Sequence, residues 1–476
     1  MDRQGKTRLD RRTFLKVFGA TAAVALAGCA KPAAPAPTTA PAPSGQQPAA
    51  TSAPQAPAQT KGVTLRALVY EWPPTVALRD ALPEYEKLTG VKVEWEVLPF
   101  AELLAKQMTE LATKSGRYDI FIPSNVWNAQ LAATGGLEVL DDYIAKAGSK
   151  LAYDEFFQIA KDQYVYKGKI YELPQSLNTY VSAWRTDVFE QEGIKAPADG
   201  IFTADEYLKI AKQLTKNGKY GSAMMMKPTG ACYFWMGTLI TAGGRFFDEK
   251  LNPQFNSKEG VAVAQWWYDL VTNAMPPDVG NYTHQEANEG MQRGLVLTQA
   301  AESAGRIPMI NDTTKSTVVG KVKWGLLPFK GIAGSSKYPT GQNFSDGFGL
   351  CIPKDSKHKQ EAFDFSVWAV DKEKQVRWAP IPVLPTRKAV MQDPALMAKQ
   401  PWLDPIARQL DNTYVFPPMP EWAEIVDKTE IELLAAYSKQ QTVQQALNNA
   451  NDAVAKLMKD RGYQVGTWTG AKLPWE

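Results

Sequence analysis

The part of the chain that follows residue 62 alternates between predicted strands and predicted helices, and this order restricts the fold class more than any other feature. Residues 63–70, 91–97 and 118–122 have the pattern of β-strands, the middle one with apolar and polar side chains alternating. Helical patterns over 76–88 and 100–114 separate the strands. Strands separated by helices predict an α/β fold with a parallel sheet.

In open sheets of this kind, ligands bind in crevices beyond the carboxyl ends of the strands. Glu71 and Trp72 directly follow the first predicted strand, and Asn125 and Trp127 follow the third. These two loops are therefore the first candidates for a binding site.

The segment 167–194 is predicted to cross between two lobes. It begins with a polar hairpin turn at 167–169, continues as a short apolar strand closed by Pro174, and then carries a polar patch that includes Asn178. An apolar run then leads into a helix that ends at Gly193. The broken hydrophobic pattern suits an extended crossing with a ligand bound beside it.

The rest of the chain has the same mixed character. No period of 20 to 50 residues recurs, so a solenoid is excluded. Helices are predicted over 204–216, 233–242, 260–273, 359–378 and 421–460, and strands over 220–226, 295–297, 322–327 and 348–352.

Residues 1–28 have the features of an export signal. Arg11 and Arg12 precede Phe14, as in twin-arginine signals, and the uncharged run 17–26 is too short to span a bilayer. The sequence Leu-Ala-Gly-Cys that ends at Cys29 resembles the lipobox of bacterial lipoproteins, in which the cysteine is lipidated. The alternative is a cleaved signal with an incidental cysteine, but the spacing favours lipidation.

Residues 30–61 consist almost entirely of Ala, Pro, Thr, Ser and Gln, and they predict an extended, disordered tether. The formal charge of +3 comes from the six basic residues of the signal, since the remainder has 47 basic and 48 acidic residues. A nearly neutral domain gives no support for a nucleic-acid partner or for membrane contact beyond the lipid anchor.

The sequence offers little for catalysis, a cofactor or a metal. It has two histidines, which excludes multi-histidine metal sites, and no phosphate-binding glycine motif. Ala301 to Gly305 only partly matches a nucleophile elbow. Cys232 and Cys351 lie in apolar contexts and are expected to be buried thiols rather than a disulfide.

The distinctive feature of the composition is its aromatic content, with 14 Trp, 18 Tyr and 18 Phe. Flat aromatic faces pack against sugar rings, while nearby polar side chains meet the hydroxyls. Trp184 is expected in a core. Four tryptophans lie beside predicted element ends or proline turns, where burial and ligand contact are equally compatible with the sequence: Trp72, Trp127, Trp235 and Trp422.

Three ordered motifs indicate a family. They are residues 168–174 with 184–189, residues 347–354, and residues 385–387 before Asp393-Pro394. With the lipobox, this set resembles the family 1 extracellular solute-binding proteins, the carbohydrate-binding lipoproteins of ABC importers to which maltose-binding protein is related.

The resemblance implies a two-lobed periplasmic-binding-protein fold of type II, with several hinge crossings and a solute held in the cleft between the lobes. It places the first lobe at about 62–177 plus 328–384 and the second at about 178–327 plus 385–476.

The resemblance also gives the cleft residues by position. The family commonly has a tryptophan platform in the segment after Gly294, which this chain lacks, and an acidic residue, Glu302, lies nearby. This difference argues against a maltose-like solute and leaves room for smaller or amino-bearing ones. The residues carried over by position are Trp72, Asn125, Trp127, Asn178, Tyr233, Trp235, Glu302 and Trp422. Glu71, Tyr180 and Asp346 are also expected to bind the ligand.

The resulting hypothesis is a monomeric, lipid-anchored, extracytoplasmic protein that captures a mono- or oligosaccharide without catalysis or cofactor and delivers it to an ABC permease. Two alternatives stay open. A cationic, polyamine-like solute would be neutralised by Glu71, Glu302 and Asp346. A lipid-anchored polysaccharide-degrading enzyme would use a carboxylate pair.

Overall fold

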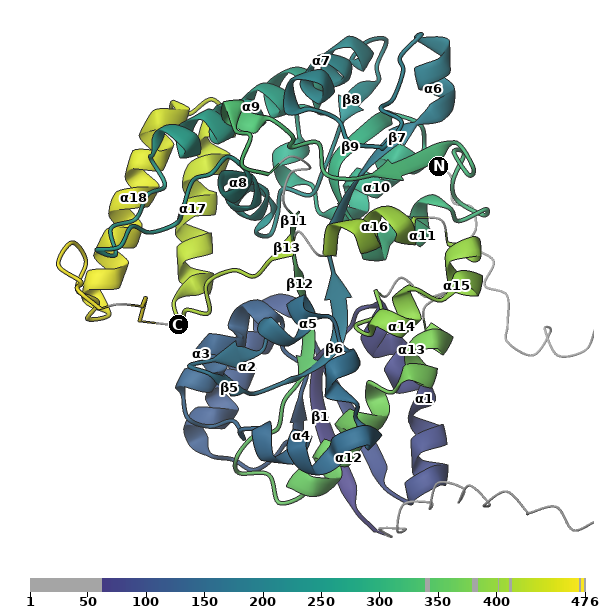
Figure 1. Cartoon of the computed structure of the whole chain (residues 1–476), viewed down its shortest axis with the longest axis vertical. Coiled ribbons are helices and arrows are strands. Elements are labelled where there is room, and N and C mark those ends of the chain that lie inside the picture. Colours follow the sequence, from purple (N-terminus) through teal and green to yellow (C-terminus); the bar gives the residue numbers. More distant parts are fainter. Residues whose placement is uncertain are drawn as a thin grey trace, which may run out of the picture. The chain divides into compact units, whose positions relative to one another are not determined.

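Figure 1 shows the computed structural model of the chain, which describes residues 62–338, 343–378, 384–400, 402–410, 413–470 and 472–474. The predicted signal, Cys29 and the tether lie outside these residues. Among the helices that the structure describes, none combines the length and the apolar composition that a membrane span requires.

The first sheet confirms the predicted alternation of strands and helices. Strands β1 (Thr64–Tyr70), β2 (Lys92–Leu98) and β3 (Ile120–Phe121) are parallel and lie in the order β2-β1-β3. Helix α1 (Pro73–Thr89) connects β1 to β2, and α2 (Phe100–Thr113) connects β2 to β3. This sheet and the helices around it form what we call the first lobe.

Local sequence explains where α1 begins and ends. Pro73 occupies the first turn, where a missing N–H costs nothing. The Thr75 hydroxyl accepts the backbone N–H of Trp72 over 3.0 Å, and this satisfies one donor at the helix start. Gly90 ends the helix in the left-handed conformation with φ of 76°. The start of α1 therefore fixes Trp72 directly beyond β1.

The predicted crossing segment joins two sheets. After the hairpin of β4 (Val165–Tyr166) and β5 (Lys169–Ile170), strand β6 (Leu173–Asn178) pairs with β12 (Asp346–Leu350). Strand β7 (Tyr180–Arg185) follows at once and pairs with strands of another sheet. The structure confirms the prediction of an extended crossing in this segment.

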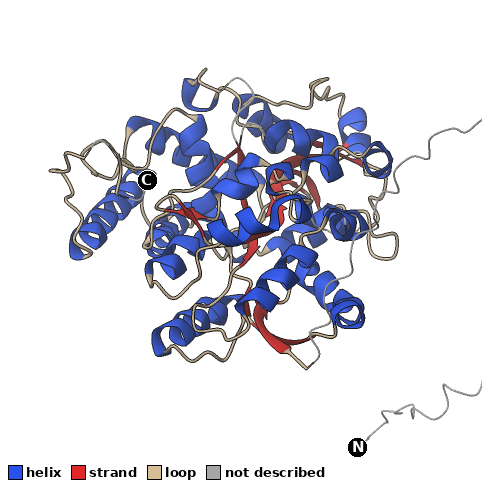
Figure 2. Ribbon diagram, turned by 60° about the horizontal axis from the view of Figure 1, so that its bottom comes forward, coloured by secondary structure: helices blue, strands red, loops and turns tan. Residues whose placement is uncertain are grey.

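The second sheet forms the centre of the second lobe. Its order is β10-β7-β9-β8, made of β7, β8 (Tyr220–Ser222), β9 (Val296–Ser303) and β10 (Val322–Gly325). The apolar core of this lobe contains side chains of the sheet and of the helices that Figure 2 shows around the strands. Helix α8 is buried along nearly its whole length, so it lacks a polar face. The helices are α7 (Ala204–Leu214), α8 (Gly230–Thr241), α9 (Lys258–Ala274), α17 (Trp422–Tyr437) and α18 (Val443–Asp460).

Three expectations need correction. Phe329, Ile332 and Phe344 pack in the core of the second lobe, so the chain returns to the first lobe only at β12, later than expected. The predicted helix 359–378 is two helices, α12 (Lys359–Ala369) and α13 (Lys372–Trp378). The predicted tail helix is also two, α17 and α18, because Lys439 takes a left-handed conformation with φ of 62° between them.

A separate apolar cluster lies at the crossing strands. Leu177 of β6 and Val181 of β7 pack there with Leu384 and Val390, so part of the predicted second lobe instead supports the hinge.

The remaining elements are α3 (Asn128–Ala133), α4 (Asp141–Ala147), α5 (Gln158–Asp162), α6 (Thr186–Gln191), α10 (His284–Gln292), α11 (Ile307–Ile310), α14 (Lys388–Met391), α15 (Pro394–Lys399), α16 (Leu403–Leu410), β11 (Asn343–Phe344) and β13 (Thr413–Tyr414).

The two cysteines of the folded part are free and buried, as predicted. Burial in apolar surroundings raises the pKa of both thiols well above the ordinary value. They serve as small core residues.

Candidate functional site

The crossing strands bring four polar side chains into one network. Asp346 of β12 is directly opposite Asn178 of β6. The hydroxyl of Tyr180 donates to Asp346 Oδ2 over 2.9 Å, and the hydroxyl of Ser303 donates to Asn178 Oδ1 over 2.6 Å. Since Ser303 ends β9 of the second lobe, the network connects that lobe to the hinge strands.

The ionisation of two members of this network, Asp346 and Tyr180, is clearly perturbed, and burial raises the pKa of the Tyr180 hydroxyl well above its ordinary value. The surroundings of Asp346 desolvate the carboxylate and raise its pKa, while hydrogen bonds from Asn178 and Tyr180 and the nearby His284 oppose that rise. The residue remains partly exposed. Asp346 is therefore a desolvated carboxylate at the hinge, in a residue that is partly exposed.

Glu302 is placed beside this network but is fully occupied. Its Oε1 lies 2.9 Å from His284 Nδ1 and accepts the Ser303 backbone N–H, also over 2.9 Å. Its Oε2 accepts the side-chain amide of Gln299 over 3.2 Å. The side chain is 0% exposed. Its carboxylate thus has protein partners on both oxygens and orients His284.

In the first lobe, Asn125 contacts the hinge. It lies in the short 3-10 helix after β3, and its Oδ1 accepts the backbone N–H of Gly347 over 3.1 Å. Trp127, two residues later, is 6% exposed and packs on Phe100 with ring centroids 4.6 Å apart. Asn125 therefore faces the hinge, while Trp127 belongs to the core of the first lobe.

Trp72 and Phe348 form an aromatic pair next to the hinge. Their ring centroids are 4.8 Å apart, and Phe348 is two residues from Asp346, on the same face of β12. Trp72 is partly exposed, and its indole N–H is buried without a hydrogen-bond partner among the described residues. The neighbouring Glu71 is exposed and pairs with Arg79 on the surface.

A small cavity spans the two lobes. Asn125, Asn128 and Gln163 line it from the first lobe, and Phe416 and Trp422 line it from the second. Its free volume is about 20 Å³, which is enough for a single water molecule. A larger solute therefore requires the two walls to separate.

The cavity walls carry polar atoms that lack hydrogen-bond partners among the described residues. They are both side-chain amide atoms of Asn128, the Gln163 Oε1 and the indole N–H of Trp422. All three side chains are more than nine-tenths buried. An unpaired buried polar group costs about 1–3 kcal/mol, so these walls favour a guest that both donates and accepts hydrogen bonds.

Three predicted aromatic residues lie in the second lobe at different depths. Tyr233 packs against Phe416, with ring centroids 5.1 Å apart, behind the cavity. Trp422 lines the cavity but is 1% exposed and belongs to the core. Trp235 is completely buried, and its indole N–H donates to the Gly260 carbonyl, so it packs as a core residue.

Four site residues were missed from the sequence: His284, Ser303, Asn128 and Gln163. Asn128 stands three residues after Asn125, a spacing that places both on one side of a helical turn and offered a usable signal. Gln163 meets the hinge through Ser345, 182 residues away, which no local pattern reveals. Within the described ranges, no group of three or more His, Cys, Asp or Glu side chains is arranged to hold a metal ion.

Comparison with protein families gives a match over most of the folded chain. Residues 71–376 match the family described as bacterial extracellular solute-binding protein. That range contains β2 and β3 of the first sheet, the crossing strands and β12.

Individual relatives agree on the architecture. The chain is 25% identical to a mannitol-binding protein of Pseudomonas aeruginosa, over 79% of this chain and 89% of that protein. It is 23% identical to a probable amino-acid ABC transporter periplasmic-binding protein of Sinorhizobium fredii, over 84% and 91%. A crystal structure of an ABC transporter solute-binding protein from Agrobacterium radiobacter in complex with ribitol is 26% identical, with a TM-score of 0.75 over 84% of this chain and all of that one.

Proposed function

The chain belongs to the family of bacterial extracellular solute-binding proteins, and we propose that it captures a small sugar or polyol between its lobes and delivers it to an ABC importer. The observation that carries this proposal is the interlobe cavity with its unpartnered amide and indole groups. Hydroxyl groups donate and accept hydrogen bonds, so a polyhydroxylated solute satisfies both kinds of atom.

Charge and aromatic surface favour the same class of solute. The Asp346 carboxylate accepts hydrogen bonds from hydroxyls, and the Trp72 and Phe348 rings offer an apolar face for C–H groups. The mannitol-binding relative and the ribitol complex extend this argument to linear polyols. A solute of this size is also compatible with a site whose walls meet closely.

Capture follows from differential affinity for two arrangements of the lobes. The walls must separate to admit a solute, and a solute that bridges Asn128 and Gln163 with Trp422 stabilises the closed form. Binding alone performs this function, without a chemical step. Delivery to a permease, a monomeric state and anchorage through lipidated Cys29 are further parts of the proposal.

A cationic solute is the second candidate. One observation supports it, because Asp346 is a partly exposed carboxylate beside an aromatic pair. The relative described as a probable amino-acid binding protein is consistent with an amino-bearing ligand. Glu302, however, already has partners on both oxygens, so the charge available to a cation is smaller than the sequence suggested.

A thermal-shift panel of polyols, monosaccharides, oligosaccharides, amino acids and polyamines tests the proposal. A solute at 100 times its Kd adds about 2.7 kcal/mol to the free energy of unfolding. We expect stabilisation by a polyol or monosaccharide that is recovered unchanged. Stabilisation by amines alone would favour the second candidate, and turnover of any glycan would overturn binding without catalysis.

A further inference from the structure

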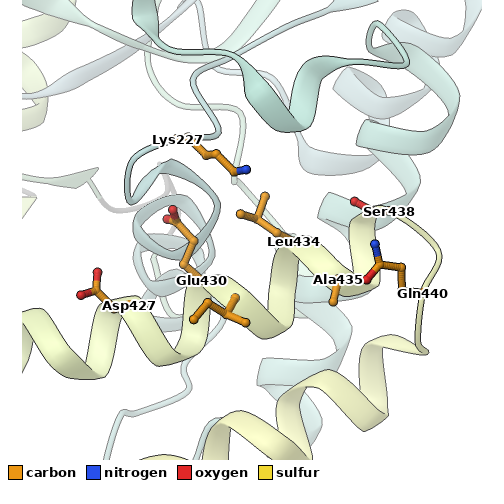
Figure 3. Close-up of a pocket in the computed structure, with 8 residues that line it drawn as sticks. Lys227, Asp427, Glu430, Leu434, Ala435, Ser438 and Gln440 are labelled. Carbon is orange, nitrogen blue, oxygen red and sulfur yellow. The ribbon is translucent and has the colours of Figure 1, made fainter.

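The second lobe has a pair of surface cavities that the interlobe site does not use. One has a volume of about 600 Å³ and the other about 430 Å³, and both exceed the interlobe cavity. They share Lys227, Leu434 and Ser438 as a common wall. Figure 3 shows the larger one, where Lys227 extends from a loop toward Leu434 of α17.

The 430 Å³ cavity has an apolar floor. Val271, Met275, Val279 and Tyr437 line it and are each at least nine-tenths buried. The volume is within the range of small-molecule sites, which are mostly apolar with a few polar groups. Such a floor favours an apolar body in the ligand.

Two lysines and one carboxylate line this cavity, so its net charge is positive. Neither Lys227 nor Lys439, which both line it, forms an ion pair with any residue that the structure describes. The carboxylate that lines this cavity, Asp278, interacts with the Tyr282 hydroxyl, while Asp427 and Glu430 line the adjoining cavity, where Glu430 accepts the backbone N–H of Thr229 over 2.8 Å. Burial also raises the pKa of Glu430 to about 7, so its negative charge is partly lost near neutral pH.

Two separate features therefore meet at one cavity. They are the apolar floor and the two lysines without an ion-pair partner among the described residues.

We propose that this cavity is a second ligand site, separate from the interlobe site, that binds a small amphipathic anion such as a carboxylate with a short alkyl or aryl body. The alkyl or aryl part lies on Val271, Met275 and Leu434, and the carboxylate is held by Lys227 and Lys439. The proposal is independent of which solute the interlobe site takes.

Hexanoate and hexan-1-ol are matched probes, because they share an alkyl chain and differ in charge. Calorimetric titration of the purified folded chain should give a hexanoate Kd at least about tenfold lower than that of hexanol, equal to about 1.4 kcal/mol. Lys227→Met keeps the side-chain stem and removes the charge, and Lys439→Gly removes the charge at a residue whose left-handed backbone glycine tolerates. We expect each variant to weaken hexanoate binding about tenfold and to leave hexanol unchanged.

The matched control is Lys250→Met, an exposed lysine that does not line either cavity. Equal binding of hexanoate and hexanol would overturn the proposal. So would unchanged hexanoate affinity in the Lys227→Met and Lys439→Gly double variant, once its thermal unfolding matches that of the parent. Competition between hexanoate and a saturating interlobe solute would assign hexanoate to the interlobe site and would also overturn it.

Discussion

The hydroxyl of Tyr180 donates a hydrogen bond to Asp346 over 2.9 Å, and this bond connects two hinge strands that are 166 residues apart in the chain. Tyr180 begins β7, which enters the second lobe, and Asp346 begins β12, which returns to the first. The carboxylate is therefore fixed where the chain crosses between the lobes.

We expect Asp346→Asn to weaken solute binding by about tenfold or more. A hydrogen bond to a charged acceptor is worth roughly 1.5–3 kcal/mol, and the amide lacks that charge. Titration calorimetry with the best solute of the panel measures the effect. Glu71→Gln is the control, since Glu71 is exposed and pairs with Arg79. Equal losses in both variants would remove Asp346 from the site.

Solute affinity should also depend on the ionisation of Asp346 and fall as the solution is acidified. Burial raises the pKa of Asp346 above its ordinary value, so the group takes up a proton at a higher pH than a free aspartate does. The ionised form is the better acceptor, so affinity should decrease as pH falls through the raised pKa. Asp346→Asn should abolish this dependence, and a dependence that persists in the variant would assign it to another group.

Trp422 should affect both stability and binding, in separable ways. Because the side chain is 1% exposed and packs on Phe246 and Phe416, Trp422→Ala should cost about 3–5 kcal/mol of unfolding free energy. Trp422→Phe keeps most of the packing but removes the unpartnered indole N–H of a side chain that lines the interlobe cavity. We expect this variant to lose solute affinity with a much smaller loss of stability, measured by urea unfolding and calorimetry. Full affinity in Trp422→Phe would make the residue purely structural.

Glu172 should make the unliganded protein less stable at higher pH. The side chain is 0% exposed, neither carboxyl oxygen has a hydrogen-bond partner among the described residues, and burial raises its pKa well above 4.5. The folded protein keeps this proton while the unfolded chain releases it above about pH 4.5. The stabilisation is thus present below that pH and is lost as pH rises toward the folded pKa, by at most about 1.4 kcal/mol per pH unit.

Urea unfolding of the parent and Glu172→Gln at pH 5 and pH 8 checks this prediction. The amide does not titrate, so the parent should lose more stability than the variant between the two values. Equal losses would show that Glu172 is ionised in the folded protein or is unshifted.

Gly349→Ala should destabilise the hinge. A β-carbon on Gly349 would lie 2.3 Å from Glu172 Oε2 and 2.8 Å from Tyr164 Cε1, both on buried side chains. Overpacking of this kind costs about 1–3 kcal/mol. Gly280→Ala is the matched control, because nothing lies within 4 Å of its added β-carbon. A loss no larger than that of the control would mean that the hinge can relax around the methyl group.

Local sequence was sufficient for the order of elements and for the crossing. Apolar spacing predicted the strands of the first sheet, and the polar patch after Pro174 predicted the change from β6 to β7. These features depend on contacts between residues that are close in the sequence, within one turn or one strand. The local pattern of apolar and polar residues therefore predicts them. Trp184 was correctly assigned to a core for the same reason.

Tertiary structure alone decided which side chains meet. Trp235 and Trp422 both stand near element ends, yet packing against distant helices buries the first completely and leaves the second at a cavity wall. Glu302 appeared free for a ligand until the fold placed His284 against it, and Phe344 joined the second lobe by packing on Tyr180. The periodicity of each helix and strand can be read from the sequence. Burial and side-chain pairing depend instead on which faces of an element are covered by other elements, and this is decided only when the whole chain has folded.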